Sequence, residues 1–434
     1  METNILRDIF FDEHNHWDKF LNKHRRKIRP VVIKEIEKFR GCGDPKRGFK
    51  LLVCEGCHNI KRIPYRCKGR FCTTCSSGET EEWSRVLNEE VFQVNHRHVV
   101  FTIDEGLWEI FLKHREMLKE FMDEAVRIVQ DWFKKKMKVT PGIIAGLHTF
   151  GAKINFNPHV HMLVTMGGMK KNGEWKSYDY LPFEMLRKQW QTVVLKLIRR
   201  KLNETEKKKV QPLLQKAYKE NRKGFYINAP KQRGNVREQL KYIGRYMRRP
   251  AIALHRIKSY DGEIVVFEYH DKTEGKMKEE RISVEEFIAR LIRQIPEEQF
   301  KTIRYYGVYS RRTKKISKKL VSAWQQRAKK WIVKVKKIIR RRKWSERIKE
   351  QTGKDPMICP ECGNYYEYKG EVCLKEGKLT IKYAKSKMAE KCLERMISDL
   401  TGIKKTETRK EEKNKRRTTQ GEKPRYRQLC VFGV

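Results

Sequence analysis

Two short apolar segments decide the fold of this chain: Ile143-Ile-Ala-Gly-Leu-His-Thr-Phe150 and His159-Val-His-Met-Leu-Val-Thr165. Both contain β-branched residues, and each has the length of a single strand. The connection between them is polar and contains Gly151 and Asn157-Pro158, which favour a turn. We therefore predict that the two segments pair as an antiparallel hairpin.

Three histidines lie on this predicted hairpin. Alternate residues of a strand project to the same face, so His159 and His161 share one face. Pairing the strands in register across the connection places His148 directly opposite His159, on that same face. The pattern predicts three imidazoles around one metal ion. A His-x-His pair in a strand is also compatible with an exposed or structural role.

The hairpin is embedded in a longer region of helices and strands. The segment His98-Val-Val-Phe-Thr-Ile103 is typical of a buried strand. The elements lack the regular order of repeated βαβ units, so we predict an α+β domain with an antiparallel sheet over residues 95–310. Its other elements are predicted as helices over 105–138, 182–222 and 235–249, a strand over 225–227, and strands with one helix over 251–306.

The composition of the chain indicates its class. The 434 residues include 100 Lys+Arg against 54 Asp+Glu, which gives a net charge of +46. No apolar run approaches the roughly 18 residues of a membrane helix, and the first residues lack the apolar core of an export signal. We therefore expect a cytoplasmic, nucleoid-associated protein of more than one domain that binds nucleic acid.

Cysteine spacing predicts a structural zinc site. Cys54-Glu-Gly-Cys57 and Cys72-Thr-Thr-Cys75 are two CxxC pairs, and two such pairs match a site in which four thiolates surround one Zn²⁺. We predict that these four cysteines bind one zinc ion. Cys42 and Cys67 exceed the four ligands that zinc needs, so they alternate as ligands, help a second site, or only pack. A further pair, Cys359-Pro-Glu-Cys362, has no predicted role.

The composition changes after residue 300. Residues 301–345 contain 18 Lys+Arg and no Asp or Glu, and we expect them to be helical around 323–342 and to contact phosphates without reading sequence. A solvated helix face is the alternative. The predicted domains are 1–94 (N-terminal helices and zinc-binding module), 95–310 (the α+β domain), 311–400 (a basic, largely helical arm with the last CxxC pair) and 401–434 (a basic, mobile tail).

Two tyrosines lie four residues apart in Tyr242-Ile-Gly-Arg-Tyr246, so a helix would place them on one face. Ordinary amphipathic packing is the plainer explanation of such a pair. Basic residues interleave with the tyrosines, however, and such a surface suits a DNA backbone better than a core. The candidate DNA-binding residues are Lys241, Arg245, Arg248 and Arg249.

These residues resemble a known family, the rolling-circle HUH transposases of the insertion sequence ninety-one type. The segment Ile154-Asn-Phe-Asn-Pro-His-Val-His-Met-Leu-Val-Thr-Met-Gly-Gly168 resembles their His-hydrophobic-His signature, and Tyr242-Ile-Gly-Arg-Tyr-Met-Arg-Arg-Pro-Ala-Ile-Ala253 resembles their tyrosine helix. The cysteine cluster is similar to their zinc-binding segment. Phe101-Thr-Ile103 and Phe300-Lys-Thr-Ile-Arg-Tyr-Tyr-Gly307 resemble further blocks, in the family's order, over residues 10–365.

The resemblance implies an HUH endonuclease core that nicks and rejoins single-stranded DNA at element ends. His159 and His161 would hold Mg²⁺ or Mn²⁺, with His148 as a third ligand where family members often carry Gln. Tyr242 and Tyr246 would be the nucleophiles and would form a 5′-phosphotyrosine. The implied partners are single-stranded DNA and hairpin element ends. No GxxxxGK[ST] motif is present, so unwinding would come from a host helicase or from the hairpin itself.

Two other functions fit parts of this pattern. A plasmid replication initiator or relaxase would use the same HUH chemistry, and the DNA that flanks the gene distinguishes it from a transposase. A non-catalytic, zinc-dependent nucleic-acid-binding protein would account only for the net positive charge. Such a protein has no reason to carry His159, His161, Tyr242 and Tyr246 together.

Overall fold

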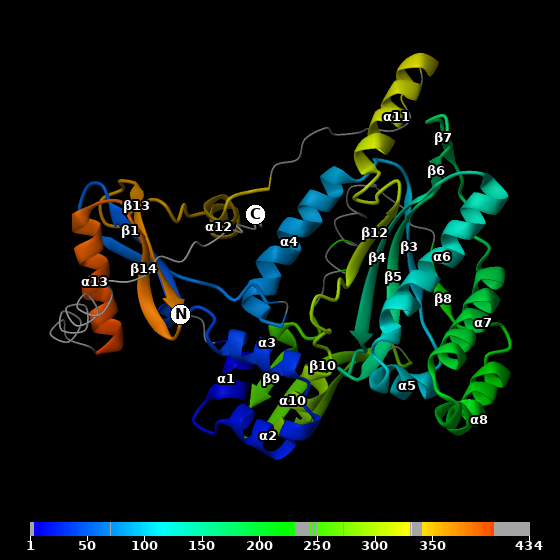
Figure 1. The fold of residues 1–434 in the computed structure, drawn as a ribbon, viewed down its shortest axis with the longest axis horizontal. Coiled ribbons are helices and arrows are strands. Elements are labelled where there is room, and N and C mark those ends of the chain that lie inside the picture. Colours follow the sequence, from blue (N-terminus) through cyan, green and yellow to red (C-terminus); the bar gives the residue numbers. More distant parts are fainter. Residues whose placement is uncertain are drawn as a thin grey trace, which may run out of the picture. The chain divides into compact units, whose positions relative to one another are not determined.

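The computed structural model of the chain describes residues 4–69, 71–230, 244, 247, 250–271, 273–329, 331 and 341–402. They divide into two compact units (Figure 1). The large unit consists of Met1–Arg40 and Cys67–Gln351, and the small unit of Gly41–Arg66 and Thr352–Val434. These boundaries differ from the predicted ones, because residues 41–66 join the C-terminal region instead of forming an N-terminal module with the residues around them.

An antiparallel five-stranded sheet forms the centre of the large unit. Its strand order is β12-β4-β5-β3-β8, and His148 on β4 pairs with His159 on β5, which confirms the predicted register. The register shifts between His148 and Phe150, where the hairpin approaches its connection. The strands are β3 (His96–Phe101), β4 (Gly142–Phe150), β5 (Phe156–Thr165), β8 (Ile227–Asn228) and β12 (Ile303–Gly307).

The two faces of this sheet have different cores. One face packs against α5 (Trp108–Lys113), α6 (Met117–Met137) and α7 (Phe183–Lys201), with α8 (Glu204–Glu220) next to α7 (Figure 1), and Phe101, Phe121 and Trp190 are fully buried there. The helix α6 has apolar residues at helical spacing, which accounts for its buried side. The opposite face packs Ile144 and Leu163 against α4 (Thr73–Glu90) and α11 (Lys314–Ala328). Because side chains alternate along a strand, the three histidines face this second side.

The large unit has further elements outside this sheet. A second antiparallel sheet, in the order β11-β10-β9, packs with α10 and the N-terminal helices. The elements are α1 (Ile5–Phe11), α2 (His16–His24), α3 (Pro30–Arg40), β6 (Gly167–Met169), β7 (Trp175–Ser177), β9 (Ile257–Tyr260), β10 (Ile264–Asp271), β11 (Lys276–Ser283), α10 (Val284–Ile292) and α12 (Trp344–Thr352), with short 3-10 turns at Arg25–Lys27, Glu105–Leu107 and Leu254–Arg256.

The small unit is a four-stranded antiparallel sheet, in the order β14-β13-β1-β2, built from two distant parts of the sequence. The helix α13 (Lys387–Thr401) covers one face and buries Leu393 against Phe49, Leu51 and Val372. The strands are β1 (Gly48–Cys54), β2 (Ile60–Pro64), β13 (Tyr366–Lys375) and β14 (Lys378–Ala384), and a 3-10 turn spans Pro45–Arg47.

The architecture confirms the predicted α+β class with antiparallel sheets. The helix predicted over 235–249 lies almost entirely outside the described residues, as does the tail predicted over 401–434 from residue 403 onward. In the described part of the chain, every helix is too short or too polar to span a bilayer.

Candidate functional site

The hairpin of β4 and β5 brings His148, His159 and His161 together. Their candidate ligand nitrogens all lie within 4.8 Å of one another, and the ring centroids of His148 and His161 are 4.4 Å apart. His148 and His161 are buried, whereas His159 is half-buried. The structure therefore places all three predicted histidines in one cluster that could hold a metal ion, with one side accessible to solvent.

Hydrogen bonds orient two of these imidazoles. The Nε2 of His148 lies 3.0 Å from the carbonyl of Met247, and the Nδ1 of His159 lies 2.8 Å from the carbonyl of Asn157. A carbonyl can only accept, so each of these nitrogens donates, and the lone pair of each neutral ring lies on its other nitrogen. Histidines that bind metals commonly donate their second ring N–H to a backbone carbonyl. The donor set therefore fits a metal ion.

A fourth histidine, His98, was not among the predicted site residues. It lies on β3, and its Nε2 is 2.9 Å from the Nδ1 of His161 on the adjacent strand β5. Burial and the neighbouring His159 lower the pKa of His98 to about 4, so its ring is neutral at neutral pH. The sequence signal that could have identified His98 is its position at the start of the predicted strand 98–103. Nothing in the sequence showed that this strand pairs with β5.

The predicted tyrosines Tyr242 and Tyr246 lie outside the described residues, as do Lys241, Arg245, Arg248 and Arg249. Met247, which follows Tyr246 in the sequence, is described and fully buried. Besides its contact with His148, it lies 3.4 Å from the position that a Cβ on Gly146 would occupy. Gly146 pairs with His161, so the absence of a side chain there leaves room for residue 247 beside the histidine cluster.

A cavity of about 460 Å³ lies beside His148 in the large unit. Its lining includes Phe150 from β4, Arg115 and Cys75. Burial lowers the pKa of Arg115 to about 10, so the guanidinium is still charged at neutral pH. The volume is within the range of roughly 300–1,000 Å³ that is usual for ligand pockets.

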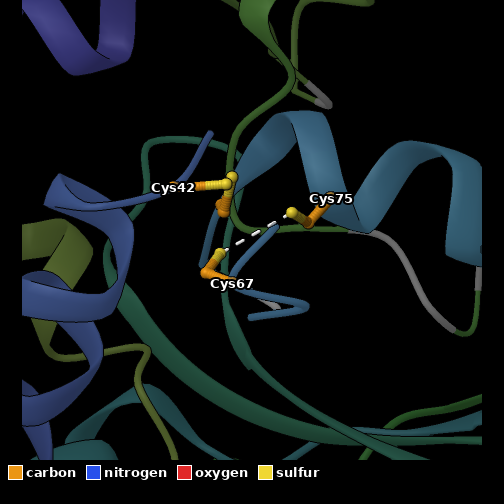
Figure 2. A group of neighbouring side chains, drawn as sticks. Cys42, Cys67 and Cys75 are labelled. Carbon is orange, nitrogen blue, oxygen red and sulfur yellow. Dashed lines mark hydrogen bonds between the residues drawn. The ribbon is translucent and has the colours of Figure 1, made fainter. Parts of the chain in front are cut away.

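Four thiols gather at the start of α4. Cys42, Cys67, Cys72 and Cys75 have sulfur atoms that all lie within 4.8 Å of one another, and those of Cys67 and Cys75 are 3.6 Å apart (Figure 2). Cys72 is the N-cap of α4, and Cys42 lies two residues after α3 ends. Tetrahedral zinc with Zn–S bonds of about 2.3 Å separates its sulfurs by about 3.8 Å, so the cluster fits a structural Zn²⁺.

The structure does not bring the predicted quartet of Cys54, Cys57, Cys72 and Cys75 together. Cys42 and Cys67 complete the set around Cys72 and Cys75, whereas Cys54 and Cys57 lie with Cys359 and Cys362 in the small unit. The reason is strand pairing: β1 ends at Cys54, and Cys54 pairs with Tyr366 on β13. The sequence signal for the second set was the CxxC spacing of Cys359 and Cys362, but only the long-range pairing shows its partner.

The basic residues of 301–345 have two environments. The helix α11 begins at Lys314, earlier than the predicted 323, and Lys314 forms an ion pair with Glu90 of α4. Arg342 donates to Glu82 of the same helix at 2.9 Å. Burial raises the pKa of Glu82, but hydrogen bonds from Arg85 and Arg342 lower it overall to about 2. Other cations in the described part of this stretch are exposed, among them Arg311, Arg312, Lys315 and Lys319.

Two families of known proteins match separate parts of the chain. Residues 13–103 match the family described as "Transposase zinc-binding domain", and residues 142–317 match the family described as "Putative transposase". The chain is 28% identical over 302 residues to "Transposase for insertion sequence element IS801" of Pseudomonas savastanoi pv. phaseolicola, which covers 66% of this chain and 72% of that protein. It is 27% identical over 299 residues to "Putative transposase y4qJ" of Sinorhizobium fredii (strain NBRC 101917 / NGR234), with 62% and 72% covered.

No solved structure matches the chain significantly. The two family matches follow one another in the order that the resemblance implied, and the second contains the whole histidine hairpin. Six clustered cysteines lie inside the first match. The chain therefore belongs to the insertion sequence ninety-one family of transposases that carry an N-terminal zinc-binding domain.

Proposed function

We propose that this transposase is a metal-dependent HUH endonuclease that nicks single-stranded DNA at element ends and rejoins the strands through a 5′-phosphotyrosine. The observation that carries the proposal is the convergence of His148, His159 and His161, with the rings of His148 and His159 oriented by backbone carbonyls. A protein that only coats DNA has no use for such a cluster.

The three histidines would hold Mg²⁺ or Mn²⁺. A bound divalent cation polarises the scissile phosphate and offsets the charge that develops during attack. This help is needed because a phenol with a pKa of about 10 is mostly protonated, and a poor nucleophile, at neutral pH. The contact between His148 and Met247 supports the proposal that the segment with Tyr242 and Tyr246 serves this site.

The tyrosine would act as a nucleophile. A new bond forms between its oxygen and phosphorus, the bond from phosphorus to the 3′ oxygen breaks, and the 3′ oxygen takes up a proton. The phosphoester is conserved as a 5′-phosphotyrosine, so a free 3′-OH can reverse the step without ATP. A second tyrosine would accept a second strand while the first remains loaded, which strand transfer requires.

Three other tyrosines of the large unit form hydrogen bonds through their hydroxyls. Tyr306 donates to Asp123 at 2.7 Å, and burial together with that carboxylate raises its pKa. Tyr260 donates to Asp12, and burial together with that carboxylate raises its pKa as well. The hydroxyl of Tyr305 accepts a hydrogen bond from Trp83 at 3.1 Å. Because the hydroxyls of these three tyrosines already form hydrogen bonds within the protein, we favour Tyr242 and Tyr246 as the nucleophiles.

The proposed partners are single-stranded DNA and the hairpins of the element ends. The exposed cations of α11 and of the segment before it would contact phosphates, while Lys314 and Arg342 hold the arm on α4 through Glu90 and Glu82. A host helicase, or the hairpin itself, would supply the single strand.

The decisive experiment incubates the purified protein with end-labelled single-stranded DNA from the element ends and Mg²⁺ or Mn²⁺. We expect a covalent protein–DNA adduct that survives denaturation and is absent with EDTA. Cleavage without an adduct, or an adduct that forms equally well with EDTA, would overturn the proposal. A replication initiator is disfavoured, because both relatives named above are transposases.

A further inference from the structure

We propose that Cys54, Cys57, Cys359 and Cys362 bind a second structural Zn²⁺, separate from the ion of Cys42, Cys67, Cys72 and Cys75. The sulfurs of Cys54 and Cys362 are 3.3 Å apart, those of Cys57 and Cys359 are 3.6 Å apart, and all four lie within 4.8 Å of one another. These separations are close to the roughly 3.8 Å between thiolates around tetrahedral zinc. The site lies wholly in the small unit.

The backbone makes the same turn at both CxxC pairs. The amide of Cys54 donates to the carbonyl of Asn59 at 2.9 Å, and the amide of Cys359 donates to the carbonyl of Asn364 at 2.8 Å. The residue after the second cysteine has a positive φ in each case, 59° at His58 and 74° at Gly363. Each turn directs two thiols to one point, which is how paired turns supply the four ligands of a zinc site.

Hydrogen bonds between the two turns hold them in place. The side-chain amide of Asn59 donates to Glu361 at 2.6 Å, and the hydroxyl of Tyr366 donates to Asn59 at 2.8 Å. Cys54 and Cys359 are buried against Leu52 and Tyr366, whereas Cys57 and Cys362 are exposed. One side of the site therefore rests on a small core, and the other side admits metal from solvent.

The metal would join two parts of the chain that are 308 residues apart. Of the sheet's four strands, β1 and β2 come from one part, and β13 and β14 from the other. A small sheet with a limited core gains stability from a closed thiolate site. We infer that this zinc stabilises the small unit without taking part in the chemistry of the histidine cluster.

The test is the zinc content of the full-length protein, purified under reducing conditions. We expect two zinc ions per chain, one in the double variant Cys359→Ser/Cys362→Ser, and one in Cys67→Ser/Cys75→Ser. The matched control is Cys373→Ser, on β13 of the same unit but in neither thiol cluster, which should keep two. One zinc in the wild type that survives Cys359→Ser/Cys362→Ser would overturn the proposal.

Because serine variants can fail to fold, the wild type provides a second readout. Stepwise replacement of zinc by Co²⁺ in the intact protein should give two equivalents with the visible and thiolate charge-transfer bands of tetrahedral four-sulfur sites. Saturation at one equivalent of Co²⁺, or a disulfide between the two CxxC pairs in place of metal, would contradict the proposed second zinc site. Both measurements are independent of nicking, so they remain informative if the proposed endonuclease activity fails.

Discussion

The Nε2 of His98 lies 2.9 Å from the Nδ1 of His161, between the paired strands β3 and β5. Two neutral imidazoles in this contact share one proton, so one ring donates and the other accepts. If His98 accepts, His161 carries its proton on Nδ1 and presents the lone pair of Nε2 to a metal. His98 would then be a positioning residue that acts through His161.

We therefore predict that His98→Ala lowers the rate of adduct formation about 10- to 100-fold, the range seen when a partner of a metal ligand is removed. Affinity for single-stranded DNA should not change. His98→Gln offers a carbonyl oxygen as acceptor and should recover part of the rate. The measurement is adduct formation against Mn²⁺ concentration, because a loosely held ligand raises the Mn²⁺ concentration required. An unchanged Mn²⁺ requirement in His98→Ala would show that His98 only packs.

Substituting either histidine of the His-x-His pair, His159→Ala or His161→Ala, should abolish cleavage and leave DNA binding nearly intact. The cation acts on the transition state, whereas charge elsewhere holds the strand. The control is His270→Ala, an exposed histidine on β10 that should cleave normally. Loss of binding in parallel with cleavage would point to a structural or DNA-holding role for the cluster.

The tyrosine variants Tyr242→Phe and Tyr246→Phe remove only the attacking oxygen, so folding should survive. We expect each single variant to form some adduct with a model oligonucleotide but to fail at complete strand transfer. The double variant should form none. A single variant that completes transposition would show that the enzyme uses one tyrosine, and a fully active double variant would redirect the search to Tyr260, Tyr305 and Tyr306.

Acid should destabilise the fold through His96. Its Nδ1 donates to Val94 at 2.7 Å and its Nε2 lies 2.8 Å from the Tyr309 hydroxyl, while burial lowers its pKa from 6.5 to about 4. As the pH falls below 6.5, His96 is protonated in the unfolded chain but stays neutral in the native state. The contribution of His96 to stability is therefore full above pH 6.5 and is lost as the pH falls towards 4. Each pKa unit corresponds to about 1.4 kcal/mol, so the loss is about 3 kcal/mol.

Urea unfolding between pH 7 and pH 4.5 measures this loss. The variant His96→Gln should be less stable than the wild type at pH 7, because it gives up hydrogen bonds in the core. Its stability should nevertheless fall less steeply with acid. Equal slopes in the two proteins would show that other groups account for the acid sensitivity.

Affinity for single-stranded DNA should fall with rising salt, with a slope in log–log form of roughly −0.7 for each phosphate neutralised. Replacing Arg311, Arg312, Lys315 and Lys319 by Ala should flatten the slope by roughly 0.7 for each residue in contact. Lys119, Lys134, Lys135 and Lys136 on α6 are also exposed, and their replacement serves as the charge-matched control. An equal change of the salt slope in the two variants would mean that the stretch 301–345 is only a solvated helix face.

The histidine hairpin could be predicted because it is local. Its partners are neighbours in the sequence, and the alternation of side chains places His148, His159 and His161 on one face without knowledge of the rest of the fold. The cysteines could not be assigned in this way. The spacing of Cys54 and Cys57 is the same whichever second pair completes the site, and the partner is chosen by the pairing of β1 with β13. His98 was missed for a related reason, since its role depends on the pairing of β3 with β5.

The pairing of β1 with β13 also bears on how the chain is made. Cys362 is synthesised 308 residues after Cys54, and a ribosome adding about 5–20 residues per second needs roughly 15–60 s for that distance. Throughout this interval β1 has emerged without the strand that covers its edge, and an unpaired apolar edge invites aggregation or proteolysis. Prematurely terminated chains would keep this exposed strand permanently. Cellular quality control could thus remove truncated transposases that still carry an intact histidine hairpin.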